Sequence, residues 1–316
     1  LAALPTFCLK EGPYTLLEGS PANGVYQGVG VVNGVFYPNI AGAGTFQIHY
    51  IYTNQCGKDT ASQLVTVNPT PTVTLGNFTT VCEGSPVITL SGGMPAGGTY
   101  SGAGVSNGQF NPATAGTYKI YYDYTDGLGC SARDSSDLIV NPLPTITLTN
   151  DTTICAGNSI TLSASGGTTY SWSNSATTAN ITVTPSTTTK YYVTVGNVNG
   201  CQQLDSVTVT VVPNPTASIA GIAAICEGSS TTLTATGGVS YAWSNSVNTA
   251  VNTVSPLTTT SYTVTVTNAN GCTSTASQLV TVNPTPTVTL GNFTTVCEGS
   301  PVITLSGGMP AGGTYS

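Results

Sequence analysis

The sequence has few charges, one histidine and no long apolar run. Asp, Glu, Lys and Arg make up 5% of the 316 residues, against about 25% in an ordinary soluble domain. Five basic residues against twelve acidic ones exclude electrostatic binding to nucleic acid or to an anionic membrane surface. The longest apolar stretch, residues 217–226, is interrupted by Ser218 and Gly221 and is too short to cross a bilayer. We therefore expect no membrane insertion.

Residues suited to catalysis or metal binding are also scarce. An active site needs several titratable groups that converge. The single histidine, His49, belongs to a strand pattern that places it on the face opposite Ile48 and Tyr50. We predict no enzyme activity, no catalytic residue and no cofactor. Four acidic residues that surround Cys130 are candidate calcium ligands, namely Asp123, Asp126, Asp134 and Asp137. The other repeating units lack this cluster, so ordinary loop acids are the alternative that we adopt, and no metal is predicted.

Alternation of apolar and hydroxyl residues is the strongest pattern present. It occurs at Ile160 and Leu162, and again at Tyr191, Val193 and Val195, which is the period of half-buried β-strands. Gly-Gly, Pro and Asn-Gly clusters separate these runs, as turns require. No helical period is visible. The sequence predicts an all-β protein whose complete units each contain about seven short strands in a β-sandwich.

The chain is a tandem array of such units. Residues 60–101 recur unchanged as residues 275–316, which indicates recent duplication. The predicted domains are 1–67 (first strand incomplete), 68–141, 142–213, 214–283 and a partial domain at 284–316. Two explanations of the incomplete end units stay open: the chain continues on both sides, which we favour, or a neighbouring molecule completes them by strand addition.

Nine cysteines point to disulfides in an oxidising, extracellular compartment. No CxxC motif occurs, which argues against zinc. We predict one bridge near one end of each sandwich, contributing about 4 kcal/mol in the chain-entropy model. The predicted pairs are Cys8–Cys56, Cys82–Cys130, Cys155–Cys201 and Cys226–Cys272, with the partner of Cys297 beyond the end of the sequence.

The predicted boundaries carry Pro-x-Pro segments, such as Asn68-Pro-Thr-Pro71 and Val212-Pro-Asn-Pro215. Proline fixes φ and favours the extended polyproline II conformation. Short, stiff linkers of this kind predict that the domains form a rod-like array.

Several aromatic side chains are of a type that can bind sugars. Trp172 and Trp243 lie in strands where sandwich domains bury a tryptophan, so we predict that both are core residues. Tyr121 and Tyr192 remain candidates for contact with glycans because the alternation places them on the outer face.

Longer motifs resemble a known group of repeats. The string C-x-G-x-S-x-T-L-x-A-x-G-G-x-x-Y-x-W-S, followed by T-x-x-Y-x-V-T-V-x-N-x-N-G-C, fits Cys155–Cys201 and Cys226–Cys272. It resembles the immunoglobulin-like and PKD-like repeats of giant surface and secreted proteins of Bacteroidota, and Cys82–Val105 resembles their companion repeat. The resemblance implies export by the type IX route and a role as stalk, adhesin or filament. The chain departs from the PKD pattern in lacking W-D-F-G-D.

Asp followed by Ser or Thr and a small or aliphatic residue resembles the O-glycosylation motif of Bacteroidota. The candidate acceptors are Thr60, Thr152 and Ser206. Chance is the alternative in a chain so rich in Ser and Thr.

Taken together, these features predict an extracellular structural array, at the cell surface as a stalk or as a filament. Its expected partners are copies of itself. The alternative is an adhesin whose loops bind glycans or a partner protein.

Overall fold

The computed structural model describes residues 1–315. The described residues form two compact units, one containing residues 1–146, 166–169 and 194–203, and one containing residues 147–165, 170–193 and 204–315. Each is described by itself. We name the successive parts repeat 1 (1–67), repeat 2 (68–141), repeat 3 (142–213) and repeat 4 (214–283), using the boundaries predicted above.

Repeats 3 and 4 have the same pair of sheets. In repeat 4, one sheet has the order β24-β26-β28 and the other the order β25-β30-β29-β27. The sheets of repeat 3 have the corresponding orders β17-β19-β21 and β18-β23-β22-β20. The strands of repeat 3 are β17 Thr147–Leu148, β18 Thr152–Cys155, β19 Ile160–Ser165, β20 Thr169–Trp172, β21 Asn180–Val183, β22 Thr189–Gly196 and β23 Gln202–Val212. Those of repeat 4 are β24 Ser218–Ala220, β25 Ala224–Cys226, β26 Thr231–Thr236, β27 Ser240–Trp243, β28 Val251–Val254, β29 Thr260–Thr267 and β30 Thr273–Asn283.

Repeats 1 and 2 vary this plan. Repeat 1 has sheets β1-β7-β6-β3 and β2-β5-β4, and repeat 2 has sheets β12-β15-β16-β9, β10-β14-β13 and β11-β8. Repeat 1 contains β1 Phe7–Cys8, β2 Tyr14–Thr15, β3 Val25–Gly28, β4 Val31–Val32, β5 Val35–Phe36, β6 Gly44–Asn54 and β7 Gly57–Asn68. Repeat 2 contains β8 Thr74–Leu75, β9 Val81–Cys82, β10 Ile88–Thr89, β11 Gly93–Met94, β12 Thr99–Ser101, β13 Val105–Ser106, β14 Gln109–Phe110, β15 Gly116–Thr125 and β16 Ser131–Asn141.

The all-β prediction is confirmed, with two differences in detail. Repeats 1, 3 and 4 each have seven strands, whereas repeat 2 has nine. Repeat 1 also contains one short helix, α1 Pro38–Ala41, which the sequence analysis did not expect. Four residues are too few to show a helical period, and Pro38 stands at the start of the helix, where proline is tolerated.

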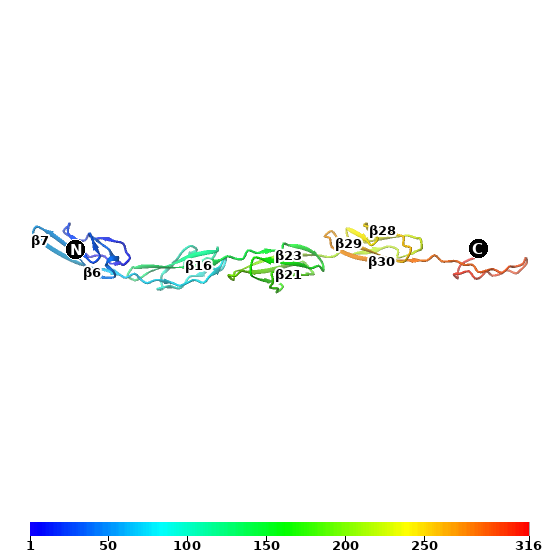
Figure 1. Cartoon of the computed structure of the whole chain (residues 1–316), viewed down its shortest axis with the longest axis horizontal. Helices are drawn as coiled ribbons and strands as arrows, with labels where there is room; N and C mark the ends of the chain where they lie inside the picture. The colour runs from blue at the N-terminus through cyan, green and yellow to red at the C-terminus, as the bar shows by residue number, and fades with distance from the viewer. Residues whose placement is uncertain (316) are drawn as a thin grey trace. The chain divides into compact units, whose positions relative to one another are not determined.

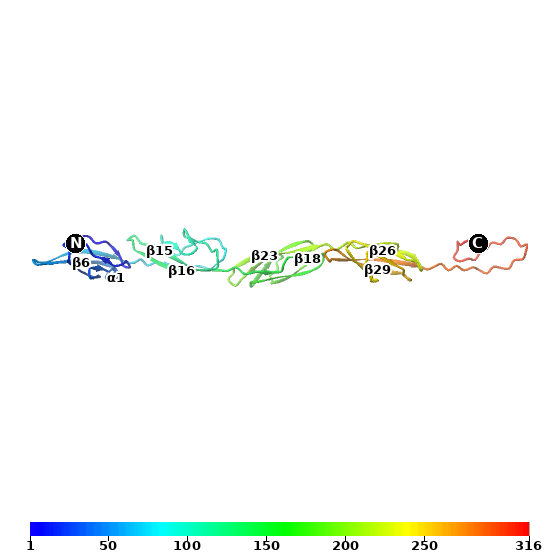
Figure 2. The ribbon, with the colours of Figure 1, turned by 90° about the horizontal axis from the view of Figure 1, so that it is seen from above.

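The core follows the predicted alternation. In β15, Ile120 and Tyr122 are buried, while Tyr118 and Tyr124 on the same face are half-buried and pack against this core. In repeat 3, Leu162 and Val193 are fully buried. Two long strands, β15 and β16 in repeat 2, pair along their length and lie side by side (Figure 2). The corresponding pairs are β6–β7 in repeat 1 and β29–β30 in repeat 4 (Figure 1).

A parallel pairing that the sequence analysis did not anticipate sets the position of the first cysteine in each repeat. The short strand that ends at this cysteine runs parallel to the last strand of the same repeat. The cysteines therefore lie opposite the residue that precedes the linker proline; the pairs are Cys8 and Asn68, Cys82 and Asn141, Cys155 and Val212, and Cys226 and Asn283. Each first cysteine thus lies at the linker end of its sandwich.

Within the described part of the chain, no helix is long and apolar enough to cross a membrane.

Candidate functional site at the repeat junctions

Three disulfides connect successive repeats. They join Cys8 to Cys130, Cys82 to Cys201 and Cys155 to Cys272, with Cα–Cα distances of 5.4, 5.5 and 5.5 Å. Each bridge runs from the first cysteine of one repeat to the second cysteine of the next. The predicted pairs Cys8–Cys56, Cys82–Cys130, Cys155–Cys201 and Cys226–Cys272 are therefore wrong. Three exposed cysteines have no partner cysteine: Cys56, Cys226 and Cys297.

The length of the last strand explains why a bridge inside one repeat cannot form. Cys82 lies opposite Asn141, at the end of β16, whereas Cys130 immediately precedes the start of β16 at Ser131. An eleven-residue strand separates its ends by roughly 33 Å at about 3.3 Å per residue. A disulfide tolerates a Cα–Cα distance of at most about 7 Å. The two cysteines of a repeat therefore lie at opposite ends of the sandwich.

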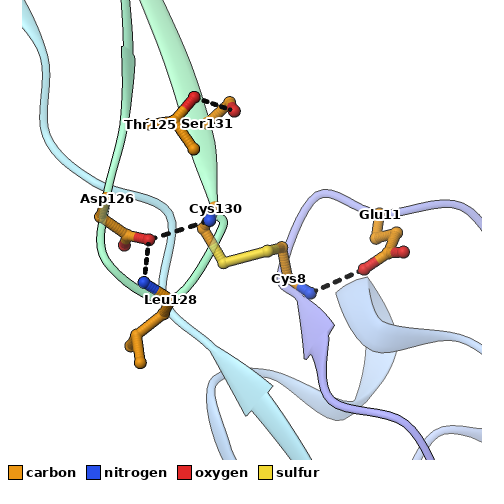
Figure 3. The surroundings of a disulfide bond; sticks show 7 residues. All are labelled: Cys8, Glu11, Thr125, Asp126, Leu128, Cys130 and Ser131. Atoms are coloured by element: carbon orange, nitrogen blue, oxygen red, sulfur yellow. Dashed lines mark hydrogen bonds between the residues drawn. A yellow bond between two sulfur atoms is a disulfide. The ribbon is translucent and has the colours of Figure 1, made fainter. Parts of the chain in front are cut away.

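The first cysteine has the same backbone environment in all four repeats. The residue that follows it donates its N–H to the carbonyl of the last strand residue, over 2.9 Å in each case: Leu9 to Asn68, Glu83 to Asn141, Ala156 to Val212 and Glu227 to Asn283. The N–H of Cys8 itself donates to Glu11 Oε2 over 2.9 Å (Figure 3). This half of the junction is fixed by main-chain hydrogen bonds.

The second cysteine is held by a turn built around one side chain. In repeat 2, Asp126 Oδ1 accepts hydrogen bonds from the N–H groups of Leu128 and Cys130, both over 2.9 Å (Figure 3). In repeats 3 and 4, an asparagine takes the same place: Asn197 Oδ1 accepts from Cys201 N–H, and Asn268 Oδ1 accepts from Cys272 N–H, both over 3.0 Å. An Asx turn of this kind is a local alternative to the strand ladder. It fixes the direction in which the thiol points.

In repeats 3 and 4, the same asparagine also binds the linker. Asn197 Nδ2 donates to the carbonyl of Pro142 over 2.9 Å, and Asn268 Nδ2 donates to the carbonyl of Pro213 over 3.1 Å. An amide can accept and donate at once, whereas the carboxylate of Asp126 can only accept. The turn of the later repeat therefore holds both the cysteine and the first linker residue, and the Asn68-Pro-Thr-Pro71 junction lacks the second of these contacts.

The three bridges overlap along the sequence. The loop closed by Cys8–Cys130 overlaps the loop closed by Cys82–Cys201, which in turn overlaps the loop closed by Cys155–Cys272. A covalent path from Cys8 to Cys272 therefore passes through two disulfides and only residues 131–154 of the main chain. Each of the three junctions between repeats 1 and 4 therefore has two covalent connections, the linker and the bridge.

The four candidate calcium ligands are not brought together. Asp123 pairs with Arg133 (Nε–Oδ1 2.7 Å), and Asp137 pairs with Lys119 (Nζ–Oδ1 2.8 Å). Asp126 forms the cysteine turn, and Asp134 Oδ2 accepts from the N–H of Leu75 over 2.7 Å. Among the described residues, no group of three or more potential metal ligands occurs. These carboxylates serve local structure in this conformation.

The other predicted site residues lie on the surface or in the core. Trp172 and Trp243 are 3% and 4% exposed, and each indole N–H donates to a main-chain carbonyl over 2.9 Å, that of Thr178 and Thr249 respectively. They are core residues, as predicted. Tyr192 is exposed, and Tyr121 is half-buried beneath the guanidinium of Arg133.

His49 and the candidate glycosylation sites lie on strands. His49 is half-buried, and its Nδ1 lies 2.7 Å from Ser62 Oγ. Thr60 is exposed in β7, whereas Thr152 and Ser206 are half-buried in β18 and β23. The N–H groups of Thr60 and Ser206 donate to the preceding aspartate. Of the three hydroxyls, that of Thr60 is the most accessible to a modifying enzyme.

Two groups with raised pKa values should make stability depend on pH in the alkaline range. The hydrogen bond and charge of Asp137 raise the pKa of Lys119 above its ordinary value of 10.5, and the hydrogen bond to Glu18 raises the pKa of Tyr14 above 10.0. Both groups keep their protons more tightly in the folded state, so their contribution is complete below these ordinary values and is lost as the pH rises through the raised pKa values.

We expect the thermal midpoint to fall above about pH 10. Circular dichroism measures this directly, with Lys119→Met as a variant that should flatten part of the alkaline loss. An alkaline fall of the midpoint that is equally steep in the Lys119→Met variant would contradict the assignment to Lys119.

The paired sandwich sheets and their cysteine junctions can be compared with known proteins. Residues 143–215 match the family model described as "Ig-like domain CHU_C associated". Repeat 3 therefore resembles an immunoglobulin-like domain, and repeat 4 has the same sheet orders. No curated protein sequence matches the chain.

The solved structures that match the chain do so at low sequence identity and with low TM-scores. An adhesin of an Antarctic bacterium, described as Ca²⁺-stabilised and as binding ice, is 16% identical with a TM-score of 0.30, over 88% of this chain and 96% of its own. The insect immune protein hemolin is 15% identical with a TM-score of 0.28, over 89% and 99% of the two chains. The I67–I69 fragment of the titin I-band is 13% identical with a TM-score of 0.30, over 76% and 92%.

Proposed function

We propose that this chain is an extracellular structural array, a stalk or filament segment whose immunoglobulin-like domains transmit tension through covalently reinforced junctions. The observation that carries the proposal is the set of bridges between successive repeats, Cys8–Cys130, Cys82–Cys201 and Cys155–Cys272. A disulfide inside a domain stabilises that domain alone. A disulfide between domains restricts their relative movement, which serves reach and stiffness.

Composition and chemistry support an extracellular setting. Disulfides persist in oxidising compartments. The stability of a protein with few surface charges depends little on ionic strength. The resemblance to Bacteroidota surface repeats supports placement on the cell surface and export by the type IX route. The single histidine, His49, forms its side-chain hydrogen bond with Ser62 (Nδ1–Oγ 2.7 Å).

The proposal predicts that the bridges limit bending at each junction. Removing a bridge by paired substitution, Cys82→Ser with Cys201→Ser, should broaden the distribution of angles between repeats 2 and 3. The β-sheet signal should stay unchanged, because both cysteines lie at the ends of their sandwiches. Negative-stain electron microscopy of single molecules, scored junction by junction, gives the angles; the junction between repeats 3 and 4 in the same molecule is the matched control.

Equal angular spread with and without the bridge would contradict the proposal. Glycan-array binding by the full oxidised chain would support the adhesin interpretation instead, with exposed Tyr192 as the first residue to test. Stiffness and binding are measured separately, so the two functions can be distinguished.

A further inference from the structure

Four charged side chains gather on the outer face of one sheet in repeat 2. Strands β15 and β16 pair along their length, and every second residue of each strand points away from the core. On that side, Lys119 pairs with Asp137 (Nζ–Oδ1 2.8 Å), and Arg133 pairs with Asp123 (Nε–Oδ1 2.7 Å). The four side chains are 36–56% exposed, so they remain accessible although each has a partner.

The sheet does not require these ion pairs for its fold. Strands β29 and β30 of repeat 4 take the places of β15 and β16 in a sheet of the same order. Where repeat 2 has the two charge pairs, repeat 4 has Ser261 opposite Leu279 and Thr265 opposite Thr275. Repeat 1 is uncharged there as well; its corresponding pairs are Gln47–Leu64 and Ile51–Thr60. Because exposed ion pairs also add little to stability, the fold alone does not explain why repeat 2 has them.

The register of the two strands arranges the four charges as a checkerboard. Lys119 lies opposite Asp137, and further along β15 Asp123 lies opposite Arg133. The charge therefore changes sign along each strand and also between the strands. Tyr121 lies between the two charge pairs on β15, with the Arg133 guanidinium 4.9 Å from the centroid of its ring. We call this outer surface of β12, β15 and β16 the checkerboard face.

The checkerboard face is electrostatically complementary to a second copy of itself. When the twofold axis between two copies runs across the strands, Lys119 of one copy faces Asp123 of the other, and Asp137 faces Arg133. When the axis runs along the strands, Lys119 faces Asp137, and Asp123 faces Arg133. Opposite charges meet in both arrangements, as in an isologous interface between identical subunits. A uniformly acidic or basic partner would place like charges opposite two of the four residues, which disfavours such a partner.

The neighbouring side chains are of types that are common in protein interfaces. Tyrosine and arginine are enriched there, and Tyr121 and Arg133 lie near the middle of the face. Ile139, on the same side of β16, is 43% exposed. Strands of ten and eleven residues together with β12 give a face of about 500 Å² at a strand spacing of about 4.8 Å and about 3.3 Å per residue. A standard interface buries about 800 Å² per partner, so the association should be weak and reversible.

We propose that the checkerboard face of repeat 2 binds the same face of a second copy of this chain. In the pair, each of the four charged side chains faces an opposite charge of the other copy, and Tyr121 and Ile139 lose part of their exposure to water. This inference goes beyond the tensile function proposed above, because tension along one chain needs no lateral partner.

The first test measures self-association of the full oxidised chain. Alkylation of the exposed thiols of Cys56, Cys226 and Cys297 prevents covalent dimers. The sedimentation coefficient should rise with chain concentration, and the dissociation constant should increase at least about tenfold between about 20 mM and about 500 mM NaCl, because salt screens exposed charges. A chain that stays monomeric at low salt, or a dimer that is insensitive to salt, would overturn the proposal.

The second test inverts the checkerboard without changing the net charge or the ion pairs inside the sheet. The inverted variant exchanges the residues of each pair: Lys119→Asp with Asp137→Lys, and Asp123→Arg with Arg133→Asp. Two inverted faces are again complementary, so the variant should associate with itself as the original chain does. An inverted face places like charges opposite all four residues of an original face, whichever way the twofold axis runs. The two chains should therefore bind each other at least about tenfold more weakly than either binds itself.

Fluorescence-detected sedimentation distinguishes these mixtures. A trace of the original chain, labelled at its free cysteines, is titrated with unlabelled original, inverted or control chain. The control exchanges two charges on repeat 3, Lys190→Glu with Asp205→Lys, and should bind the tracer as the original chain does. Equal binding of the original and inverted chains would overturn the proposal, since another surface would then mediate the association.

A further pair of variants serves if the inverted chain does not fold. Lys119→Glu with Arg133→Glu makes the face acidic, and Asp123→Lys with Asp137→Lys makes it basic. Neither variant should associate with itself, whereas a mixture of the two should form heterodimers. A mixture that stays monomeric, although circular dichroism shows that both chains are folded, would overturn the proposal. None of these outcomes bears on the three bridges, so failure of the lateral pairing would leave the proposed tensile function intact.

Discussion

Pulled from its two ends, the oxidised chain should lengthen far less than the reduced chain. In the oxidised chain, the covalent path from Cys8 to Cys272 contains two disulfides and residues 131–154, which span at most about 85 Å at roughly 3.5 Å per residue. In the reduced chain, each unfolding repeat of 67–74 residues releases about 200 Å after its folded length is subtracted. Single-molecule force spectroscopy should therefore show a series of steps of this size only after reduction.

Controls for this experiment are contained in the chain. Residues 1–7 and 273–316 lie outside the outermost bridges, so they add the same length in both states. Bridges within repeats would leave three unclosed segments between Cys8 and Cys272, namely residues 57–81, 131–154 and 202–225. Their maximum extension would be about threefold larger than that of residues 131–154 alone. An oxidised chain that extends by this larger amount would contradict the bridging described here.

A single bridge can be removed to test the overlap. With Cys82→Ser and Cys201→Ser, the path through Cys8–Cys130 and Cys155–Cys272 is unchanged, so the maximum extension between the outer bridges should stay the same. With Cys8→Ser and Cys130→Ser, that path is broken at repeat 1 and the extension should increase. This asymmetry follows from the order of the cysteines alone.

Much of the fold was predictable because it depends on local patterns. Period-2 alternation identified the strands around Leu162 and Val193, and the same alternation placed Trp172 in the core. Turn signals separated the strands correctly because Asn-Gly and Gly-Gly pairs have strong local preferences. The nine strands of repeat 2 and the helix at Pro38–Ala41 were missed because two- to four-residue elements are too short to establish a period.

The cysteine pairing was not predictable from spacing, since it depends on a long-range pairing. Intervals within a repeat are regular, but so are intervals between the first cysteine of one repeat and the second of the next. The deciding fact is that the strand ending at Cys82 runs parallel to β16 and ends beside Asn141. The sequence pattern indicates that one full strand separates Cys130 from the linker. Combined with a parallel first strand, that distance would have excluded the bridge within a repeat.

The four acidic residues near Cys130 are close together in the sequence but do not converge in the fold. Four carboxylates close together in sequence suggested calcium, but alternation on β15 and β16 distributes them among different partners. Asp123 and Asp137 meet cations on neighbouring strands, while Asp126 closes the turn that presents the cysteine. Proximity in sequence does not imply convergence when the residues lie on both strands of a hairpin.

Replacing Trp172 by alanine should destabilise repeat 3 by about 3–5 kcal/mol, because the indole is buried and a large cavity remains. The substitution also leaves the carbonyl of Thr178 without the 2.9 Å hydrogen bond from the indole N–H. Domains of this size have a total stability of about 5–10 kcal/mol, so repeat 3 should be close to unfolding at 37 °C. Hydrogen exchange at Leu162 and Val193 measures the loss without a tryptophan signal.

Tyr192→Ala is the matched control, since its side chain is 44% exposed on the same sandwich and its loss should change stability by less than about 1 kcal/mol. Repeat 4 in the Trp172→Ala variant gives a second comparison, because Trp243 and its bond to Thr249 are unchanged. Cys155–Cys272 and Cys82–Cys201 remain attached to repeat 3 when it unfolds, so the loss should appear as local exchange and not as separation of the array. Unaltered protection at Leu162 would show that the tryptophan is dispensable for the core, whereas protection lost in repeats 3 and 4 together would show that the bridges make the repeats unfold as one unit.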